Sequence, residues 1–306
     1  MMKQAFSLSF PAKRWTVLLL ATGSSLLFTM PLAIPLAIPL ALGGNDAPHG
    51  AGLAASIVEI TSQDVALLPA GPAECPPDAG AEDPGELAHV RQAIQTSHLI
   101  RIVTLGPWGT PASRTGKAMP AVPWLTAVML KQALPQVTIF LSPQGARGEQ
   151  AQTTADRLPS ILKDAHYDLA LWQSGTVEAE RNMPPSAYYD ALKDGVGRLL
   201  SANTDIVLID LPYSHLLNTY ADPALYEDAL EQAAVPDGVA LYPRFDIMRR
   251  WVTTGAMSRH TEGNIRVKDI ALQHRACLAR SLMHFILQGA GIKPENPSTP
   301  YQPPGK

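Results

Sequence analysis

The sequence of 306 residues carries little charge, because Asp, Glu, Lys and Arg make up only 17% of it, against roughly 25% in an average soluble domain. Its formal net charge is −3, and no block of lysine or arginine occurs beyond the first few residues. Binding to DNA or RNA requires a basic surface that neutralises backbone phosphates. The composition therefore argues against a nucleic-acid-binding protein.

Cysteine is also scarce. The two cysteines, Cys75 and Cys277, are far apart in sequence and too few for a four-cysteine zinc site or a four-thiolate iron–sulfur cluster. The eight histidines are scattered, without the short spacings that metal-ligand pairs show. We therefore expect no metal site and no cofactor, and at most one disulfide.

Proline, by contrast, is abundant, with 28 residues, roughly twice the usual share of about 5%. Several prolines lie in an uncharged stretch from Trp15 to Leu42 that follows three basic residues. This layout is typical of an export signal or a membrane anchor, and prolines at 31–42 would kink a spanning helix. We expect residues 1–43 to be a signal peptide or N-terminal anchor. The protein is then exported, periplasmic or anchored facing the periplasm, with membrane contact only through this segment.

The next segment, residues 44–96, changes character. Between 45 and 97 there are eight acidic residues and one arginine, interspersed with Pro, Gly and Ala clusters. This composition predicts a linker or a strap over a domain surface, with a solvated spacer favoured for 45–73. Cys75 indicates that the chain is tied down near that residue. The last residues, 291–306, are expected to form a flexible tail.

A regular alternation of strand-like and helix-like segments occupies residues 97–290. Short apolar runs rich in β-branched residues predict five strands, at 99–105, 137–141, 169–172, 206–209 and 239–242. Helical patterns lie at 121–134, 152–164, 186–201, 222–234, 244–254 and 269–288. Such alternation predicts an α/β fold with a parallel sheet covered on both faces, and sites at the carboxyl ends of its strands. Chemistry is therefore expected in the loops after Leu105, Leu141 and Trp172.

Those three loops carry distinctive sequences in a distinctive order. They read Leu105-Gly-Pro-Trp-Gly-Thr110, Gly145-Ala-Arg-Gly-Glu149 and Leu171-Trp-Gln-Ser-Gly-Thr-Val-Glu178, and Cys277-Leu-Ala-Arg280 follows in the closing helix. Together they resemble the ordered blocks of the SGNH (GDSL-type) esterase and lipase family, over residues 98–289. The resemblance implies a flavodoxin-like three-layer sandwich with a five-stranded parallel sheet.

The same resemblance implies that the reaction has been lost. In this family the blocks supply a nucleophilic Ser, a Gly and an Asn for the oxyanion hole, and an Asp and a His that activate the Ser. The corresponding positions here hold, in that order, Trp108, Gly148, Val177, Arg266 and Asp269. Only Gly148 matches, and Pro107 beside Trp108 has no N–H to donate. The sequence is thus identified as a catalytically degenerate member, a pseudoenzyme.

An active esterase or deacetylase with relocated catalytic residues is the alternative. Thr110 in the first loop and His260 or His274 near the last block are candidates for a new hydroxyl–histidine–carboxylate set. Each also has an ordinary explanation, as a capping hydroxyl or a surface histidine.

A protein without the reaction can keep the binding cleft. Trp108 offers an aromatic platform for a sugar ring or an acyl chain, and Gly148, Glu149 and Glu178 lie on the adjoining loops. A bulky indole equally fills an abandoned pocket, and Glu149 can simply cap the next helix. We therefore expect either a carbohydrate or acyl ligand or a scaffold for an envelope enzyme, and leave both open.

Cys75 and Cys277 permit one structural prediction. Export would place them in an oxidising compartment, where a disulfide would pin the predicted strap to the last helix. The other interpretation is a buried, unpaired Cys277 that packs as a small apolar residue. We favour the disulfide.

Overall fold

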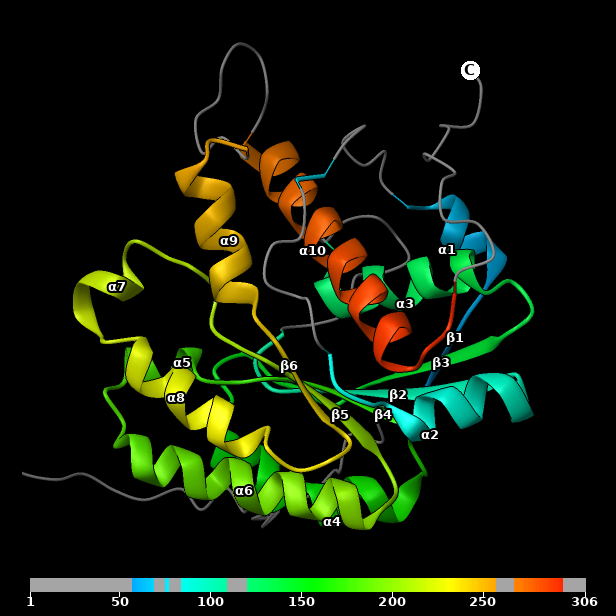
Figure 1. The fold of residues 1–306 in the computed structure, drawn as a ribbon, viewed down its shortest axis with the longest axis horizontal. Helices are drawn as coiled ribbons and strands as arrows, with labels where there is room; N and C mark the ends of the chain where they lie inside the picture. The colour runs from blue at the N-terminus through cyan, green and yellow to red at the C-terminus, as the bar shows by residue number, and fades with distance from the viewer. Residues whose placement is uncertain (1–56, 69–74, 77–83, 109–119, 257–266, 294–306) are drawn as a thin grey trace, which may run out of the picture. The chain divides into compact units, whose positions relative to one another are not determined.

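The computed structural model describes residues 57–68, 75–76, 84–108, 120–256 and 267–293, with side chains in the last range from residue 270 onward (Figure 1). The predicted signal or anchor at 1–43 and most of the predicted tail lie outside these residues. Within the described part, no helix has the length and hydropathy needed to cross a membrane.

The described strands form one mixed sheet. They are β1 (Val58–Ile60), β2 (Leu99–Leu105), β3 (Thr138–Pro143), β4 (Leu169–Gln173), β5 (Asp205–Ile209) and β6 (Val239–Tyr242). The order across the sheet is β1-β3-β2-β4-β5-β6. Only β1 is antiparallel to its neighbour, and β2 to β6 are parallel. The parallel strands therefore run in the flavodoxin-like order 2-1-3-4-5, which confirms the predicted fold class.

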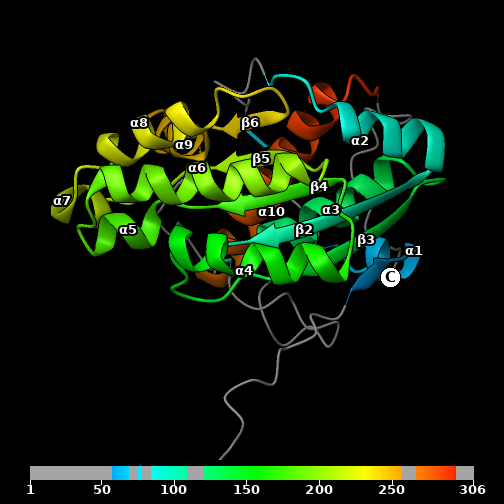
Figure 2. The same cartoon turned by 90° about the horizontal axis from the view of Figure 1, so that it is seen from below.

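Helices cover both faces of the sheet (Figures 1 and 2). One face carries α3 (Val122–Ala133), α9 (Arg244–Thr253) and α10 (Val267–Gly289), and the other carries α4 (Ala151–Asp164), α6 (Pro185–Ser201) and α8 (Ala224–Ala233). Shorter helices are α1 (Ser62–Ala66), α2 (Ala88–Gln92) with a π-helical turn at Ala93–Ser97, α5 (Thr176–Glu180) and α7 (Leu217–Tyr220). The six helices predicted from periodicity are all present, with ends shifted by two residues or fewer.

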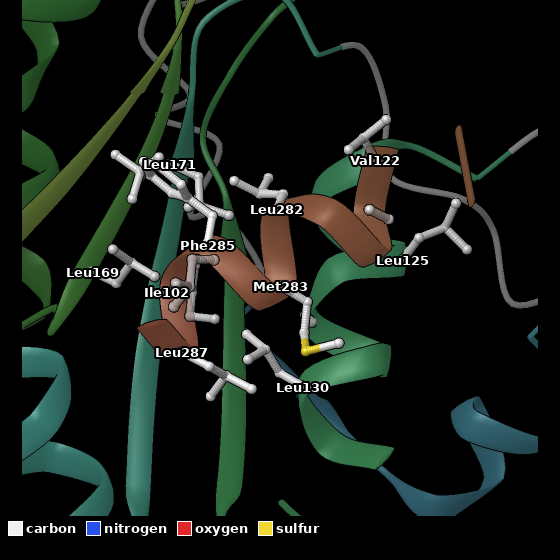
Figure 3. Close-up of a cluster of buried hydrophobic side chains, with 14 of the residues drawn as sticks. Ile102, Val122, Leu125, Leu130, Leu169, Leu171, Leu282, Met283, Phe285 and Leu287 are labelled. Carbon is white, nitrogen blue, oxygen red and sulfur yellow. The ribbon is translucent and has the colours of Figure 1, made fainter. Parts of the chain in front are cut away.

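The alternation of side chains along each strand divides the core into two layers. In β4, Leu169 and Leu171 belong to one buried cluster, whereas Ala170 and Trp172 belong to the other. Figure 3 shows the first cluster, where Leu169 and Leu171 lie beside side chains of α10, and α3 lies on the other side of that helix. Because β4 is buried on both faces, its sequence is a continuous apolar run, as expected of a central parallel strand.

The described parts of the segment predicted as a linker or strap belong to the domain. Residues 58–66 form β1 and α1, and β1 pairs with β3 along the sheet edge. In and beside α2, Leu87 and Val90 are fully buried, and the Leu87 N–H donates to the carbonyl oxygen of Gly289 at 3.0 Å. These apolar contacts outweigh the Pro/Gly-rich composition, so the domain begins before the predicted boundary at residue 97.

The predicted disulfide is present. Cys75 and Cys277 are bonded, with their Cα atoms 5.4 Å apart, and Cys277 in α10 is 1% exposed. The bond joins the segment before α2 to the last helix across a sequence separation of 202 residues.

Candidate functional site

The loops after the parallel strands meet at one edge of the sheet, because parallel strands share the same carboxyl edge. The loops after β2 and β4 are in direct backbone contact. Gly106 has φ of 87°, and a Cβ there would lie 1.9 Å from the carbonyl oxygen of Gln173. A Cβ on Gly145, in the loop after β3, would lie 1.9 Å from the carbonyl oxygen of Gly106. Both positions therefore require glycine, and they set the position of the chain that leads to Trp108.

Trp108 is the residue that the sequence comparison assigned to the nucleophile position. Its backbone N–H donates to the carbonyl oxygen of Gly106 at 2.9 Å, closing a tight turn. The half-buried indole packs against the core layer that contains α3 and α10, and its buried Nε1 has no hydrogen-bond partner. The guanidinium carbon of Arg244 lies 5.8 Å from the ring centroid, a cation–π contact.

Arg244 and Asp210 form a buried pair beside this indole. Asp210 directly follows β5, and Arg244 follows β6 after one proline. The guanidinium donates to the backbone carbonyl of Asp210, while the Asp210 carboxylate accepts the Phe245 N–H at 2.8 Å. Burial raises the pKa of Asp210 and lowers the pKa of Arg244 to about 10. Both shifts oppose ionisation, and the mutual attraction of the two charges reduces each of them.

Gly148 has φ of 74°, the left-handed conformation that glycine favours. The next residue, Glu149, is 7% exposed and its carboxylate is engaged internally. It accepts the Ala146 N–H at 2.6 Å and bonds to Arg157 at 2.6 Å and to Thr154 at 3.2 Å. These bonds explain its burial and give it a structural role.

The Glu178 carboxylate is also engaged in internal hydrogen bonds. Its carboxylate accepts the N–H of Ala151, the first residue of α4, at 2.6 Å, and the N–H of Gly175 at 3.1 Å. Burial raises the pKa of Glu178, and the two backbone N–H donors oppose that shift. The residue thus links the loop after β4 to the start of α4 and does not face a cleft. Neighbouring Val177, at the position of the oxyanion Asn, is 5% exposed and offers no polar atom.

Sequence reasoning missed several polar residues at this edge. Besides Asp210 and Arg244, these include Ser174 and Tyr188, whose buried hydroxyls interact with each other. Asp210 and Arg244 could have been found, because both follow predicted strands just as the other loops do. Tyr188 lies in α6, whose helical pattern gives no sign that its hydroxyl reaches the loop after β4.

The remaining predicted residues are not brought together by the described structure. Thr110, His260 and Arg266 lie outside the described residues, as does the side chain of Asp269 within α10. His274 is half-buried in α10 and already has an interaction partner. In the part of the chain that the structure describes, no group of three or more His, Cys, Asp or Glu side chains is arranged to hold a metal ion.

An acidic pair lies between α8 and α9, formed by Glu227 of α8 and Asp246 of α9. Glu227 of α8 is half-buried, and one of its carboxylate oxygens has no hydrogen-bond partner. Burial, with the nearby Asp246 carboxylate, raises its pKa from 4.5 to about 6. Arg249, which pairs with Asp246 at 2.7 Å, opposes the shift.

This raised pKa predicts a pH dependence of stability. The folded protein holds the Glu227 proton more tightly than the unfolded chain does. The contribution of this proton to the free energy of unfolding is therefore complete below about pH 4.5 and is lost as the pH rises through about 6. Glu227→Gln is expected to be more stable than the unmodified protein at pH 7, by about 1 kcal/mol after allowance for partial exposure. The advantage should disappear at pH 4.5. Urea unfolding at both pH values measures this difference in stability, and Glu180→Gln, at an exposed residue, is the control. Parallel profiles of stability against pH for Glu227→Gln and the unmodified protein would contradict the prediction.

Strand order and helix layers define a flavodoxin-like α/β protein. The model of the non-GDSL lipase-like family matches residues 72–292, and the chain belongs to this family. No curated protein sequence matches the chain.

Three solved structures are similar in outline. A variant of Axe2, an acetyl-xylooligosaccharide esterase from Geobacillus stearothermophilus, is 13% identical with a TM-score of 0.49, over 63% of this chain and 95% of that one. TesA is 16% identical with a TM-score of 0.45, over 62% and 99%. The psychrotrophic esterase EstA from Pseudoalteromonas sp. is 18% identical with a TM-score of 0.35, over 46% and 76%.

Proposed function

We propose that this protein is an exported pseudoenzyme of its family, which acts by binding and does not hydrolyse esters. The observation that carries the proposal is Trp108. Its indole occupies the position of the nucleophile, packs against the core and lies beside the buried Arg244 guanidinium. An indole has no hydroxyl or thiol that a base could activate.

The surroundings of Trp108 support the same conclusion. Acyl transfer needs fixed N–H donors for the charge that develops on the carbonyl oxygen. Pro107 has no N–H, and Val177 has no side-chain amide. The buried charged pair beside this indole, Asp210 and Arg244, bonds to backbone atoms, and the two groups interact with each other. None of them is a base placed against a nucleophile.

The site around Trp108 can act in two ways without catalysis. The exposed part of the Trp108 indole is suited to stack on a sugar ring or pack on an acyl chain. The packing of the same indole against the core instead favours a scaffold, whose partner would be an envelope enzyme. Ligand binding is our main proposal, because part of the indole is exposed. The scaffold is the second candidate, because the rest of the indole packs against the core.

Activity measurements test the proposal. We expect no hydrolysis above background on short-chain acyl esters or acetylated sugars, and no labelling by a serine-directed phosphonate. Trp108→Ser alone should not restore turnover, because a base and an oxyanion donor would still be missing and triad members act as a unit. The smallest set expected to regain turnover adds Val177→Asn, Asp269→His and Arg266→Asp.

Clear hydrolysis by the unmodified protein, abolished by Thr110→Ala or His260→Ala, would overturn the proposal in favour of the relocated active site. Calorimetric titration with an acetylated oligosaccharide and a fatty acid separates the two modes. Saturable heat that Trp108→Ala removes supports ligand binding, and its absence with both ligands supports the scaffold.

A further inference from the structure

A cavity of about 640 Å³ lies at the amino ends of β5 and β6, the opposite edge of the sheet from Trp108. This volume falls within the range of small-molecule sites, about 300–1,000 Å³. Its walls come from the start of α2, the first residues of β5 and β6, and the loop between α8 and β6. The lining residues are Pro84, Gly85, Glu86, Ala88, His89, Leu200, Asp205, Glu231, Ala234, Val235, Pro236, Asp237, Gly238, Val239, Ala240 and Leu241.

The α2 wall of this cavity is held in place by buried hydrogen bonds. One carboxylate oxygen of Asp205, a fully buried residue, accepts the Val90 N–H at 2.9 Å, and the other bonds to Nδ1 of His89 at 2.8 Å. Arg91 donates from Nε to the carbonyl oxygen of Ala290 at 2.9 Å, next to the Leu87–Gly289 bond. The wall is therefore fixed to both the sheet and α10, and the cavity is formed before any ligand enters.

His89 is oriented by this arrangement. Because the Asp205 carboxylate can only accept, Nδ1 of His89 carries the proton of this bond, and in the neutral form of the ring Nε2 is then an acceptor. The His89 side chain is 40% exposed. The ring is therefore accessible, and its second nitrogen can accept a hydrogen bond from a ligand.

The exposed acidic side chains that line the cavity can also accept hydrogen bonds from a ligand. Glu86, Glu231 and Asp237 are exposed carboxylates, which accept and do not donate. Glu86 pairs at 2.9 Å with Arg91, which does not line the cavity. Among the described residues that line the cavity there is no lysine or arginine. These three carboxylates are thus acceptors only, and the cleft concentrates negative potential.

The rest of the lining is apolar and matches an aliphatic stem. Ala234, Pro236, Leu200 and Leu241 contribute aliphatic surface, and Val235 at the cavity is 79% exposed. A group with several N–H donors, a positive charge and a short hydrocarbon stem satisfies both the acceptors and the apolar surface.

We propose that this cavity binds an ammonium or guanidinium group carried on an aliphatic stem. Two sources have this chemistry, a free alkylamine and a lysine or arginine side chain of a protein partner. The inference does not depend on the pseudoenzyme proposal, because the two sites lie at opposite edges of the sheet.

NMR titration of the full-length protein with agmatine tests the assignment, with sodium acetate as the anionic comparison. We expect saturable shifts in backbone amides at 85–89 and 237–239 with agmatine, and none with acetate. Glu231→Gln/Asp237→Asn, which changes two exposed residues, should weaken agmatine binding about tenfold. The matched control Glu180→Gln/Asp190→Asn removes the same charge outside the cavity and should leave the affinity unchanged.

A blocked peptide with one arginine distinguishes the sources: tighter binding than agmatine assigns the cavity to a protein partner, and equal or weaker binding assigns it to a free amine. The proposal is overturned if agmatine gives no saturable shift at these amides, or if acetate gives the same shifts. It is equally overturned if the two double variants bind alike.

Discussion

Gly106→Ala is expected to destabilise the protein by more than about 4 kcal/mol, a loss that few single substitutions cause. The new Cβ would lie 1.9 Å from the carbonyl oxygen of Gln173 and 3.0 Å from its carbonyl carbon. Both atoms belong to the backbone of β4, which is buried on both faces and cannot retreat as a flexible side chain could. The φ of 87° adds a further penalty for any residue with a Cβ.

Urea unfolding of Gly106→Ala measures this loss, and Gly197→Ala is its matched control. Gly197 lies inside α6, and a Cβ there would meet nothing within 4 Å. The control should therefore gain stability, by about 0.5–1 kcal/mol, because alanine favours the helix and reduces the freedom of the unfolded chain. A Gly106→Ala protein as stable as the unmodified one would show that the contact between the β2 and β4 loops is not as described.

Replacement of both cysteines, Cys75→Ala/Cys277→Ala, is expected to be the second large loss. The bond closes a loop across a sequence separation of 202 residues. Chain-entropy arithmetic for such a loop gives about 5 kcal/mol, and measured losses are typically about 2–5 kcal/mol. Alanine at 277 leaves a small apolar side chain in the core, so the lost covalent link dominates the effect.

Reduction provides the internal control for this prediction. Dithiothreitol should lower the stability of the unmodified protein nearly to that of the double variant, and should leave the variant unchanged. A double variant that unfolds at the same urea concentration as the oxidised protein would contradict a stabilising role for the bond.

The sequence predicted the central part of the fold well, for physical reasons. The runs at 99–105 and 206–209 are rich in β-branched residues and largely buried, so their apolar signal is continuous. By contrast, β1 has three residues, of which only Ile60 is buried. Such a strand carries no periodic signal, and its pairing with β3 depends on tertiary contacts.

The sequence predicted where the site loops lie, but it predicted the interactions of their side chains only in part. The loop blocks located Trp108 and Gly148 at the carboxyl edge of the sheet, but sequence order could not show which carboxylates are engaged inside. Glu149 and Glu178 looked available, and the structure instead gives them backbone N–H and arginine partners. Arg244 was missed because its relation to Trp108 joins residues that are far apart in sequence.

The link between Cys75 and Cys277 also makes most of the domain one covalent ring. Every strand of the parallel sheet, β2 to β6, lies between the two cysteines in the sequence. A protease that cuts the chain once anywhere in this ring produces two polypeptides that still form a single molecule. Such a nick would leave the apparent mass of the domain unchanged on a non-reducing gel and would separate the fragments only after reduction.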